Sequence, residues 1–193
     1  MAIEIEAKIK VPDHESIRQR IRDIGGEHVG DFFETNTFFD TPDGKLRAAD
    51  EGLRVRTLKN LHGPRGQGTG RTTYILTFKG PAQDSTLKQR EELETDVTDG
   101  DTLKAIIERL GFAERLTFEK KRQTWRVNRC QVELDEVPML GTYIEIEGPD
   151  TQSIEAVRIE LGLANEPLVK SGYSSLLAKA LERTGEGKAA RFD

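Results

Sequence analysis

Short segments in which charged and apolar residues alternate begin at the third residue of the chain, and they limit what it can fold into. Along residues 3–9, isoleucine and alanine take the odd positions, whereas Glu4, Glu6 and Lys8 take the even positions. A period of two predicts a β-strand with one apolar and one charged face. Two acids one pleat apart can share a divalent cation through oxygen ligands. A lysine one pleat further on can meet a phosphate held by that cation.

The same kind of charged face recurs in six further segments. This repetition matters, because a single charged strand face is usually just in contact with water. Most of these segments set an apolar face against the charged one. The charged residues concerned are Arg54 and Arg56, then Lys79, then Arg90, Glu92 and Glu94, then Lys120 and Arg122, then Glu133 and Asp135, and finally Glu145 and Glu147.

Hydrophobic spacing and turn residues divide the chain into about eight strands, mostly in hairpins, and four helices. The strands are expected at about 3–11, 29–40, 53–56, 74–79, 90–97, 118–127, 131–137 and 143–147. The first helix is expected to begin at Asp13, a candidate N-cap, and to end at the glycines 25–26. Further helices are expected at about 103–110, from about residue 150, and after Gly172. The apolar stripe of the last helix is expected to face inward and comprises Tyr173, Leu176, Leu177 and Leu181.

Eight antiparallel strands can close into a barrel, and closure removes exposed sheet edges. The helices also carry apolar stripes that need a partner, so the economical arrangement packs them against the apolar outer faces and leaves the charged faces inside. An open sheet with its charged faces in water is the alternative, but it offers four helices too little apolar area. We therefore expect an α+β fold, an eight-stranded antiparallel closed barrel with helices packed outside.

A charged interior agrees with the composition, because 35% of the residues are hydrophobic and 33% are charged. So many charged side chains cannot be buried without water or counter-charges. A wet tunnel that holds a divalent metal and a polyanion satisfies both sets, since acids bind the metal and bases bind the anion.

The glycine-rich residues 62–71 lie between two predicted strands. They lack the Gly-Lys-Ser/Thr ending of a phosphate-binding P-loop, and no helical pattern follows them. We therefore expect a mobile hairpin tip. The sequence leaves open whether this tip closes over a ligand.

The net charge of -5 argues against a general surface for nucleic acid or membrane. The single cysteine, Cys130, excludes an internal disulfide and has no supporting catalytic motif, so we interpret it as structural. The amino terminus is charged from its fourth residue, unlike a signal peptide, and no segment approaches the length of a membrane span. We expect a cytoplasmic protein, monomeric or homodimeric.

The ordered set of charged segments resembles the CYTH superfamily, the triphosphate tunnel metalloenzymes. The alternation Glu4-x-Glu6-x-Lys8 resembles the family's amino-terminal motif, and matching segments follow in order over almost the whole chain. The resemblance is closest to the class IV adenylyl cyclase-like branch and implies a single CYTH-like domain over residues 1–193. The further matching segments are 53–56, 76–80, 90–94, 119–122, 134–137, 140–147 and 171–177.

This resemblance implies a tunnel that binds a linear triphosphate, with Mg²⁺ or Mn²⁺ as cofactor. By resemblance, the residues that would bind substrate are Lys8, Arg54, Arg56, Lys79, Arg90, Lys120 and Arg122. The metal ligands would be Glu4, Glu6, Glu145 and Glu147, joined by Glu133 and Asp135. The catalytic set would comprise Glu4, Glu6 and Lys8, with Glu92 and Glu94 orienting basic residues or a water.

Three functions remain open from the sequence. A metal-dependent triphosphate hydrolase is slightly preferred over a class IV adenylyl cyclase, because the motifs recognise the triphosphate that both reactions share and no adenine-selecting residues can be identified. A non-catalytic polyphosphate- or nucleotide-binding module is less favoured, since anion binding alone needs no paired carboxylates. The acidic surface and the lack of an aromatic platform argue against long nucleic acid as a partner, so we expect a small-molecule triphosphate.

Overall fold

The computed structural model describes residues 3–62, 70–185 and 187–193. Its barrel strands are β1 (Ile3–Lys10), β2 (Glu27–Asp40), β3 (Gly52–His62), β4 (Thr72–Lys79), β5 (Lys88–Val97), β6 (Ala113–Val127), β7 (Cys130–Val137) and β8 (Gly141–Glu147). The helices are α1 (Glu15–Asp23), α2 (Lys45–Ala48), α3 (Gly100–Arg109), α4 (Thr151–Glu160) and α5 (Tyr173–Thr184). A short β9 (Ala189–Ala190) pairs in parallel with β6.

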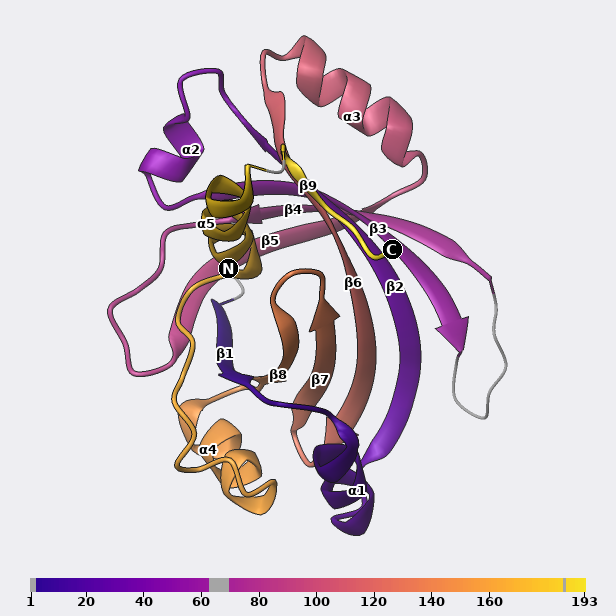
Figure 1. The fold of residues 1–193 in the computed structure, drawn as a ribbon, viewed down its shortest axis with the longest axis vertical. Helices are drawn as coiled ribbons and strands as arrows, with labels where there is room; N and C mark the ends of the chain where they lie inside the picture. Colours follow the sequence, from indigo (N-terminus) through magenta and orange to yellow (C-terminus); the bar gives the residue numbers. More distant parts are fainter. Residues whose placement is uncertain (1–2, 63–69, 186) are drawn as a thin grey trace.

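The eight long strands form a closed antiparallel barrel, which confirms the predicted fold (Figure 1). Neighbours around the barrel follow the order β2-β3-β4-β5-β1-β8-β7-β6, and β2 pairs with β6 to close the ring. The closing pair runs from Glu27 opposite Arg126 to Asp40 opposite Ala113, with register shifts at His28/Gly30 and Phe38/Phe39. This long pairing explains why β2 and β6 both begin earlier than hydrophobic alternation alone predicts.

Three helices pack on the outside of the barrel, as predicted. Ile17 and Ile21 of α1 and Ile154 of α4 belong to one buried cluster with the outward-facing residues of β1, β6, β7 and β8. On another side, Ile107 of α3 packs against Val55 of β3. Because side chains alternate along a strand, burying these apolar residues outside directs the charged residues of the same strands inward.

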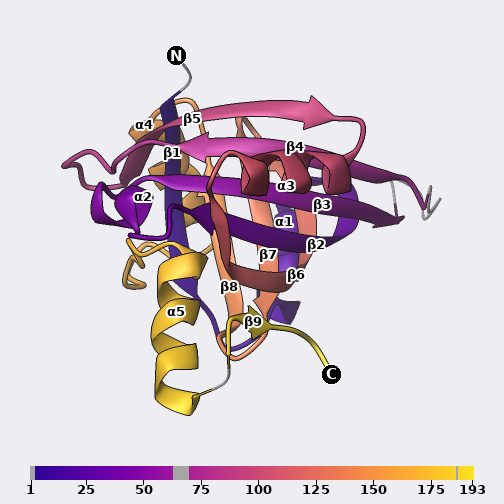
Figure 2. The same ribbon diagram turned by 90° about the horizontal axis from the view of Figure 1, so that it is seen from above.

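The last long helix, α5, takes a different position. Its residues Tyr173, Leu177 and Leu181 pack with Phe118 and Tyr143. Phe118 and Tyr143 lie one pleat from charged inner-face residues of their strands, so α5 packs against residues of the inner faces rather than the outer ones. Figure 2 shows α5 set apart from α1, α3 and α4.

Smaller differences from the predicted elements have local causes. The first helix begins at Glu15 with His14 in the N-cap position, and Asp13 accepts a hydrogen bond from the Glu15 backbone N–H at 2.9 Å. Both α2 and β9 are too short to show a hydrophobic period and were not predicted. Most of the glycine-rich loop, residues 63–69, lies outside the described residues. Within the part of the chain that the structure describes, no helix is long and apolar enough to cross a membrane.

Candidate active site in the barrel interior

The inner faces of the strands line a cavity of about 1280 Å³. Every predicted site residue except Asp135 lines it. Asp135 is fully buried and reaches the site through its contacts with Arg122. The cavity is also lined by residues that the sequence pattern did not assign to the site, including Asn36, Lys88, Gln131 and Tyr173.

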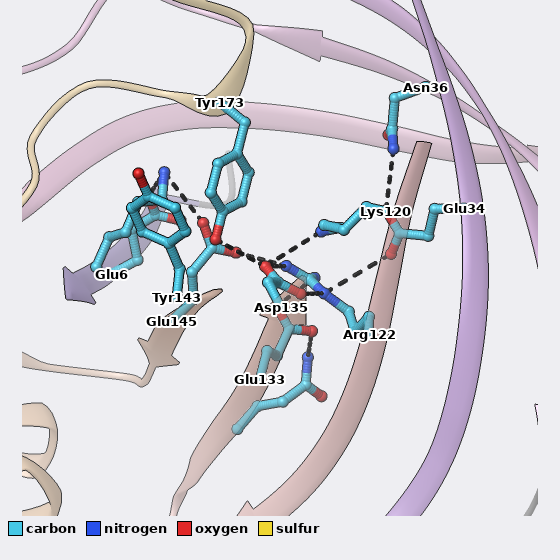
Figure 3. Close-up of polar contacts among 12 residues, drawn as sticks. Glu6, Glu34, Asn36, Lys120, Arg122, Glu133, Asp135, Tyr143, Glu145 and Tyr173 are labelled. Atoms are coloured by element: carbon cyan, nitrogen blue, oxygen red, sulfur yellow. Dashed lines mark hydrogen bonds and ion pairs between the residues drawn. The ribbon is translucent and has the colours of Figure 1, made fainter. Parts of the chain in front are cut away.

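Arg122 lies at the centre of three carboxylates (Figure 3). Its Nε and Nη2 donate to the two oxygens of Asp135, each at 2.6 Å, and Nη2 also donates to Glu145 at 2.5 Å. Its Nη1 forms an ion pair with Glu133. Burial works against the charged guanidinium, but the acids outweigh it and raise the pKa of Arg122 well above its usual value. This arginine therefore stays charged and rigidly oriented.

The three acids around Arg122 have the chemistry of a divalent-metal site. Glu133, Asp135 and Glu145 each offer an oxygen, and these oxygens lie within 4.8 Å of one another. Glu133 and Glu145 are direct cross-strand neighbours on β7 and β8, an arrangement of like charges that is unfavourable without a cation nearby. Burial, and then the charges of Asp135 and Glu145, raise the pKa of Glu133 despite Arg122. Oxygen donors of this kind fit Mg²⁺ or Mn²⁺.

The other three predicted metal ligands, Glu4, Glu6 and Glu147, lie on the paired strands β1 and β8. Glu6 and Glu147 face each other directly on β1 and β8. Among the described residues Glu147 has no ion pair, and burial together with the charges of Glu4 and Glu6 raises its pKa. Of the six predicted ligands, the structure thus brings Glu133, Asp135 and Glu145 into one tight cluster and leaves Glu4, Glu6 and Glu147 outside it.

Glu4 and Glu92 form a carboxyl pair on β1 and β5. Burial opposes ionisation of Glu4, but its hydrogen bond with Glu92 and the charges of Lys79 and Lys88 lower its pKa. Burial and the same hydrogen bond raise the pKa of Glu92. The pKa of Glu92 therefore lies above that of Glu4. Lys79 Nζ lies 2.9 Å from Glu4 and 2.6 Å from Glu92.

Two arginines project from β3 into the cavity. Arg54 donates to Thr77 at 3.0 Å and to Glu94 at 3.1 Å, so the predicted role of Glu94 in orienting a basic residue agrees with its position. Burial, and then the charge of Arg56, lower the pKa of Arg54 to about 10. Arg56 Nε lies 3.7 Å from Glu34. Both guanidiniums remain charged at neutral pH and can donate to phosphate oxygens.

Two lysines complete the buried part of the cationic lining. Lys8 Nζ lies 3.1 Å from Glu145 and 3.7 Å from Glu6. Lys120 Nζ lies 3.3 Å from Glu34 and 3.4 Å from Asp135. These acids hold the lysines in place, so a ligand that binds them has to carry enough negative charge to compete.

Arg90 occupies the rim of the cavity rather than its centre. Its Nη2 lies 3.2 Å from Asp50, an exposed residue just after α2. Of all the predicted substrate-binding residues, Arg90 is the one whose ion-pair partner lies outside the barrel strands.

Sequence reasoning missed three residues that contribute to the site. Glu34 is 1% exposed and lies within 3.7 Å of Arg56, Lys120 and Arg122. The alternation of Glu34 and Asn36 within a predicted strand was the signal for it. Lys88 Nζ lies 2.6 Å from Glu6, and extending the alternation of Arg90 and Glu92 back by one pleat finds it. The third, Tyr173, was expected only as an apolar contact of the last helix.

Comparisons with known proteins agree on one family. The profile of the CYTH domain matches residues 2–174. A putative adenylate cyclase of Methanocaldococcus jannaschii, MJ0240, is 28% identical over 145 residues, which cover 75% of this chain and 76% of that protein. Among solved structures, the PH1819 protein of Pyrococcus horikoshii OT3 superposes with a TM-score of 0.77 at 26% identity, covering 92% of this chain and 99% of that one.

A further solved structure shares the fold at lower identity. It is HpAC1 from Hippeastrum, with a TM-score of 0.64 at 21% identity, covering 94% of this chain and 96% of that one. Its description is that of a putative adenylyl cyclase with a dominant triphosphatase activity.

Proposed function

The chain belongs to the CYTH domain family, and on that premise we propose that its barrel interior is the active site of a metal-dependent enzyme that hydrolyses a linear triphosphate. One observation carries the proposal. Basic side chains from five strands converge on a closed cavity that also holds a tight cluster of three acids. The basic residues are Lys8 (β1), Arg54 and Arg56 (β3), Lys79 (β4), Lys88 and Arg90 (β5), and Lys120 and Arg122 (β6).

The shape and charge of the cavity support a slender polyanion as the ligand. A closed ring of strands admits a linear chain of phosphates but excludes a folded polymer. The buried cations already have carboxylate partners, such as Glu34 for Lys120 and Glu92 for Lys79. A single phosphate offers too little charge to compete with these partners, whereas a triphosphate offers several oxygens to arginine and lysine at once.

The acids supply the donor set for the metal. Glu133, Asp135 and Glu145 would hold Mg²⁺ or Mn²⁺, and Glu6 and Glu147 across β8 provide further oxygen ligands. When bound, the metal would neutralise phosphate charge and lower the pKa of a water molecule.

The chain's own residues contribute orientation and charge stabilisation. Phosphoryl transfer depends mainly on positioning and on stabilising the charge of the equatorial oxygens. Arg54 is oriented by Thr77 and Glu94, and Arg122 by Asp135, so neither guanidinium has to reorganise during the reaction. Glu4 and Glu92 lie 2.9 Å and 2.6 Å from Lys79 Nζ and hold this lysine in the cavity.

Cyclisation of ATP is the second candidate. It is favoured by the likeness to the Methanocaldococcus jannaschii protein, which is named a putative adenylate cyclase. In that reaction a ribose hydroxyl attacks the α-phosphorus, and the products are cyclic AMP and pyrophosphate. The Hippeastrum protein shares the fold and pairs a cyclase name with a dominant triphosphatase activity, which supports hydrolysis as the first choice.

A product assay on the purified protein tests the proposal. ATP, inorganic triphosphate and thiamine triphosphate are each supplied with Mg²⁺ or Mn²⁺, and a chelator is added in parallel reactions. Phosphate release that depends on the metal is the expected result. Cyclic AMP with pyrophosphate from ATP would establish a cyclase instead. Binding of the triphosphates without turnover would establish a non-catalytic binding module.

A further inference from the structure

Tyr173 comes from outside the barrel strands, yet its side chain enters the barrel interior. It is the first residue of α5, and its hydroxyl donates to Asp135 Oδ2 at 2.9 Å. The centre of its ring lies 4.2 Å from Lys8 Nζ and 5.5 Å from Lys120 Nζ. Figure 3 shows its hydroxyl directed toward Asp135, next to Lys120 and Arg122. One side chain thus contacts an acid of the candidate metal cluster and two cations of the proposed phosphate site.

The surroundings fix this tyrosine in place. Its ring packs edge-on against Tyr143, with the ring centres 5.3 Å apart. The chain just before it is tied to β1, because the Val169 backbone N–H donates to the Lys8 carbonyl at 2.8 Å. The Ser171 carbonyl in turn accepts a hydrogen bond from Lys8 Nζ at 3.2 Å. Backbone and side-chain contacts therefore hold Tyr173 in register with Lys8.

A lysine ammonium group interacts with the face of an aromatic ring in a different way from how it interacts with a carboxylate. The ring attracts the ammonium group through its quadrupole but carries no net charge. Lys8 and Lys120 each contact both the ring and an acid, which is Glu145 for Lys8 and Asp135 for Lys120. The ring therefore helps to hold the two ammonium groups without neutralising them, which leaves their charge available to an anion.

The hydroxyl of Tyr173 acts on the acid side of the site. Asp135 is fully buried and already accepts two bonds from Arg122. The third strong donor, from Tyr173, approaches the oxygen that also faces Lys120. This bond fixes the carboxylate plane and so fixes the direction in which Arg122 points.

We infer that Tyr173 is a positioning residue for the proposed reaction: its ring sets the places of the Lys8 and Lys120 ammonium groups, and its hydroxyl sets the orientation of Asp135. This inference rests on the proposed function. The segment 168–173 then contributes to the active site as well as to the packing of α5.

Two variants separate the ring from the hydroxyl. Tyr173→Phe and Tyr173→Leu both remove the hydroxyl, but only the second removes the ring. With inorganic triphosphate and Mg²⁺, we expect Tyr173→Leu to raise KM about 30-fold, the size of a desolvated cation–π contact. We expect Tyr173→Phe to keep KM and to lower kcat, because Asp135 loses a donor while the lysines keep their ring.

A third variant controls for loosening of the helix. Leu181→Ala removes a buried contact of α5 two turns beyond Tyr173 and touches neither lysine. It should lower the melting temperature while KM and kcat stay unchanged. A rise in KM with Leu181→Ala as large as with Tyr173→Leu would overturn the inference, as would a KM for Tyr173→Leu equal to that of the wild type.

The failure of the proposed function gives a different result. If the wild-type protein shows no turnover, the affinity of the same three variants for inorganic triphosphate is measured by calorimetry. Tyr173→Leu, which removes the ring, is then expected to raise Kd. A wild-type protein that neither turns over nor binds inorganic triphosphate would overturn the proposed function and this inference together.

Discussion

The two sides of the barrel differ in how deeply their charges are buried. We call β1, β8, β7 and β6 the covered wall, because α1 and α4 pack on its outer face. We call β3, β4 and β5 the open wall, because α3 covers only part of it and Leu93 on β5 is 50% exposed. Inside, the side chain of Asp135 on the covered wall is 0% exposed, whereas that of Glu94 on the open wall is 41% exposed.

Because of this difference in burial, the charged residues on the two walls of one cavity have different roles. On the covered wall, the acids and Arg122 interact at low dielectric, so their contacts are strong and their geometry is rigid. On the open wall, the side chains of Lys79 and Glu94 are 18% and 41% exposed, so water screens their ion pairs more and leaves Lys79 easier to redirect. Removing a charge should therefore cost mainly stability on the covered wall and mainly substrate affinity on the open wall.

The largest effect is expected from Arg122→Ala on the covered wall. It leaves Glu133, Asp135 and Glu145 without their shared cation, and an uncompensated buried charge cluster costs about 3–5 kcal/mol of unfolding free energy. Mn²⁺ should restore more of the melting temperature in this variant than it adds to the wild type, because the metal can replace the lost charge. Thermal melts with and without Mn²⁺ measure both effects. Arg126→Ala, an exposed arginine on the same strand, is the control and should melt like the wild type.

A smaller effect is expected from Glu34→Gln, which tests the reverse case of buried cations without their acid. Arg56, Lys120 and Arg122 lower the pKa of Glu34 well below its usual value although burial opposes this. The unfolding free energy should fall by about 2 kcal/mol at neutral pH. Inorganic triphosphate should then raise the melting temperature more in the variant than in the wild type.

The depressed pKa of Glu34 also gives the sign of the pH dependence. Its contribution to stability is fully present above its unfolded pKa of 4.5 and is lost as the pH falls toward its folded pKa. The difference in unfolding free energy between wild type and Glu34→Gln should therefore be largest at neutral pH and shrink below about pH 4. A difference that grows on acidification would contradict the assigned role.

Lys79→Ala probes the open wall. We expect KM for the triphosphate to rise about tenfold, because one charge-assisted contact to phosphate is lost. The melting temperature should change by less than for Arg122→Ala, since the ion pairs of Lys79 are partly exposed. Lys59→Ala, an exposed lysine on β3, is the matched control for steady-state kinetics. A loss of stability as large as that of Arg122→Ala would remove the distinction between the two walls.

The smallest effect is expected from Cys130→Ser, at the start of β7 in the apolar cluster outside the barrel rather than in the charged interior. Burial, and then the charge of Asp150, raise the pKa of the Cys130 thiol, so little thiolate forms at neutral pH. Iodoacetamide should label the native protein slowly and the unfolded protein fast. Activity of Cys130→Ser should stay within about twofold of the wild type, as expected for a structural thiol.

The sequence predicted the barrel and the contents of its interior because both follow from a period of two. A residue such as Glu92 or Arg54 is assigned to the inner face once its strand is recognised. The grouping of the acids was not predictable, because it depends on which strands are neighbours. The pairing of β1 with β8 sets Glu6 against Glu147, while the β6–β7 register sets Arg122 against Asp135.

Tyr173 shows the same limit for helices. Its place in an apolar stripe predicted that it is buried, and this is correct. The stripe gave no sign that the hydroxyl reaches Asp135, because α5 lies against inner-face residues rather than outside the barrel. Contacts between segments 38 residues apart in sequence follow from tertiary packing and not from local pattern.

The position of β1 between β5 and β8 has a consequence for how the chain folds during synthesis. β1 is synthesised before the other described strands, but its partner β8 ends only at Glu147. The closing strands β2 and β6 are also distant, with Thr37 and Thr117 separated by 80 residues. Topologies dominated by such long-range pairs fold slowly. Nascent chains that end before β8 (Gly141–Glu147) therefore carry the Glu4, Glu6 and Lys8 motif without the cavity that gives it a role.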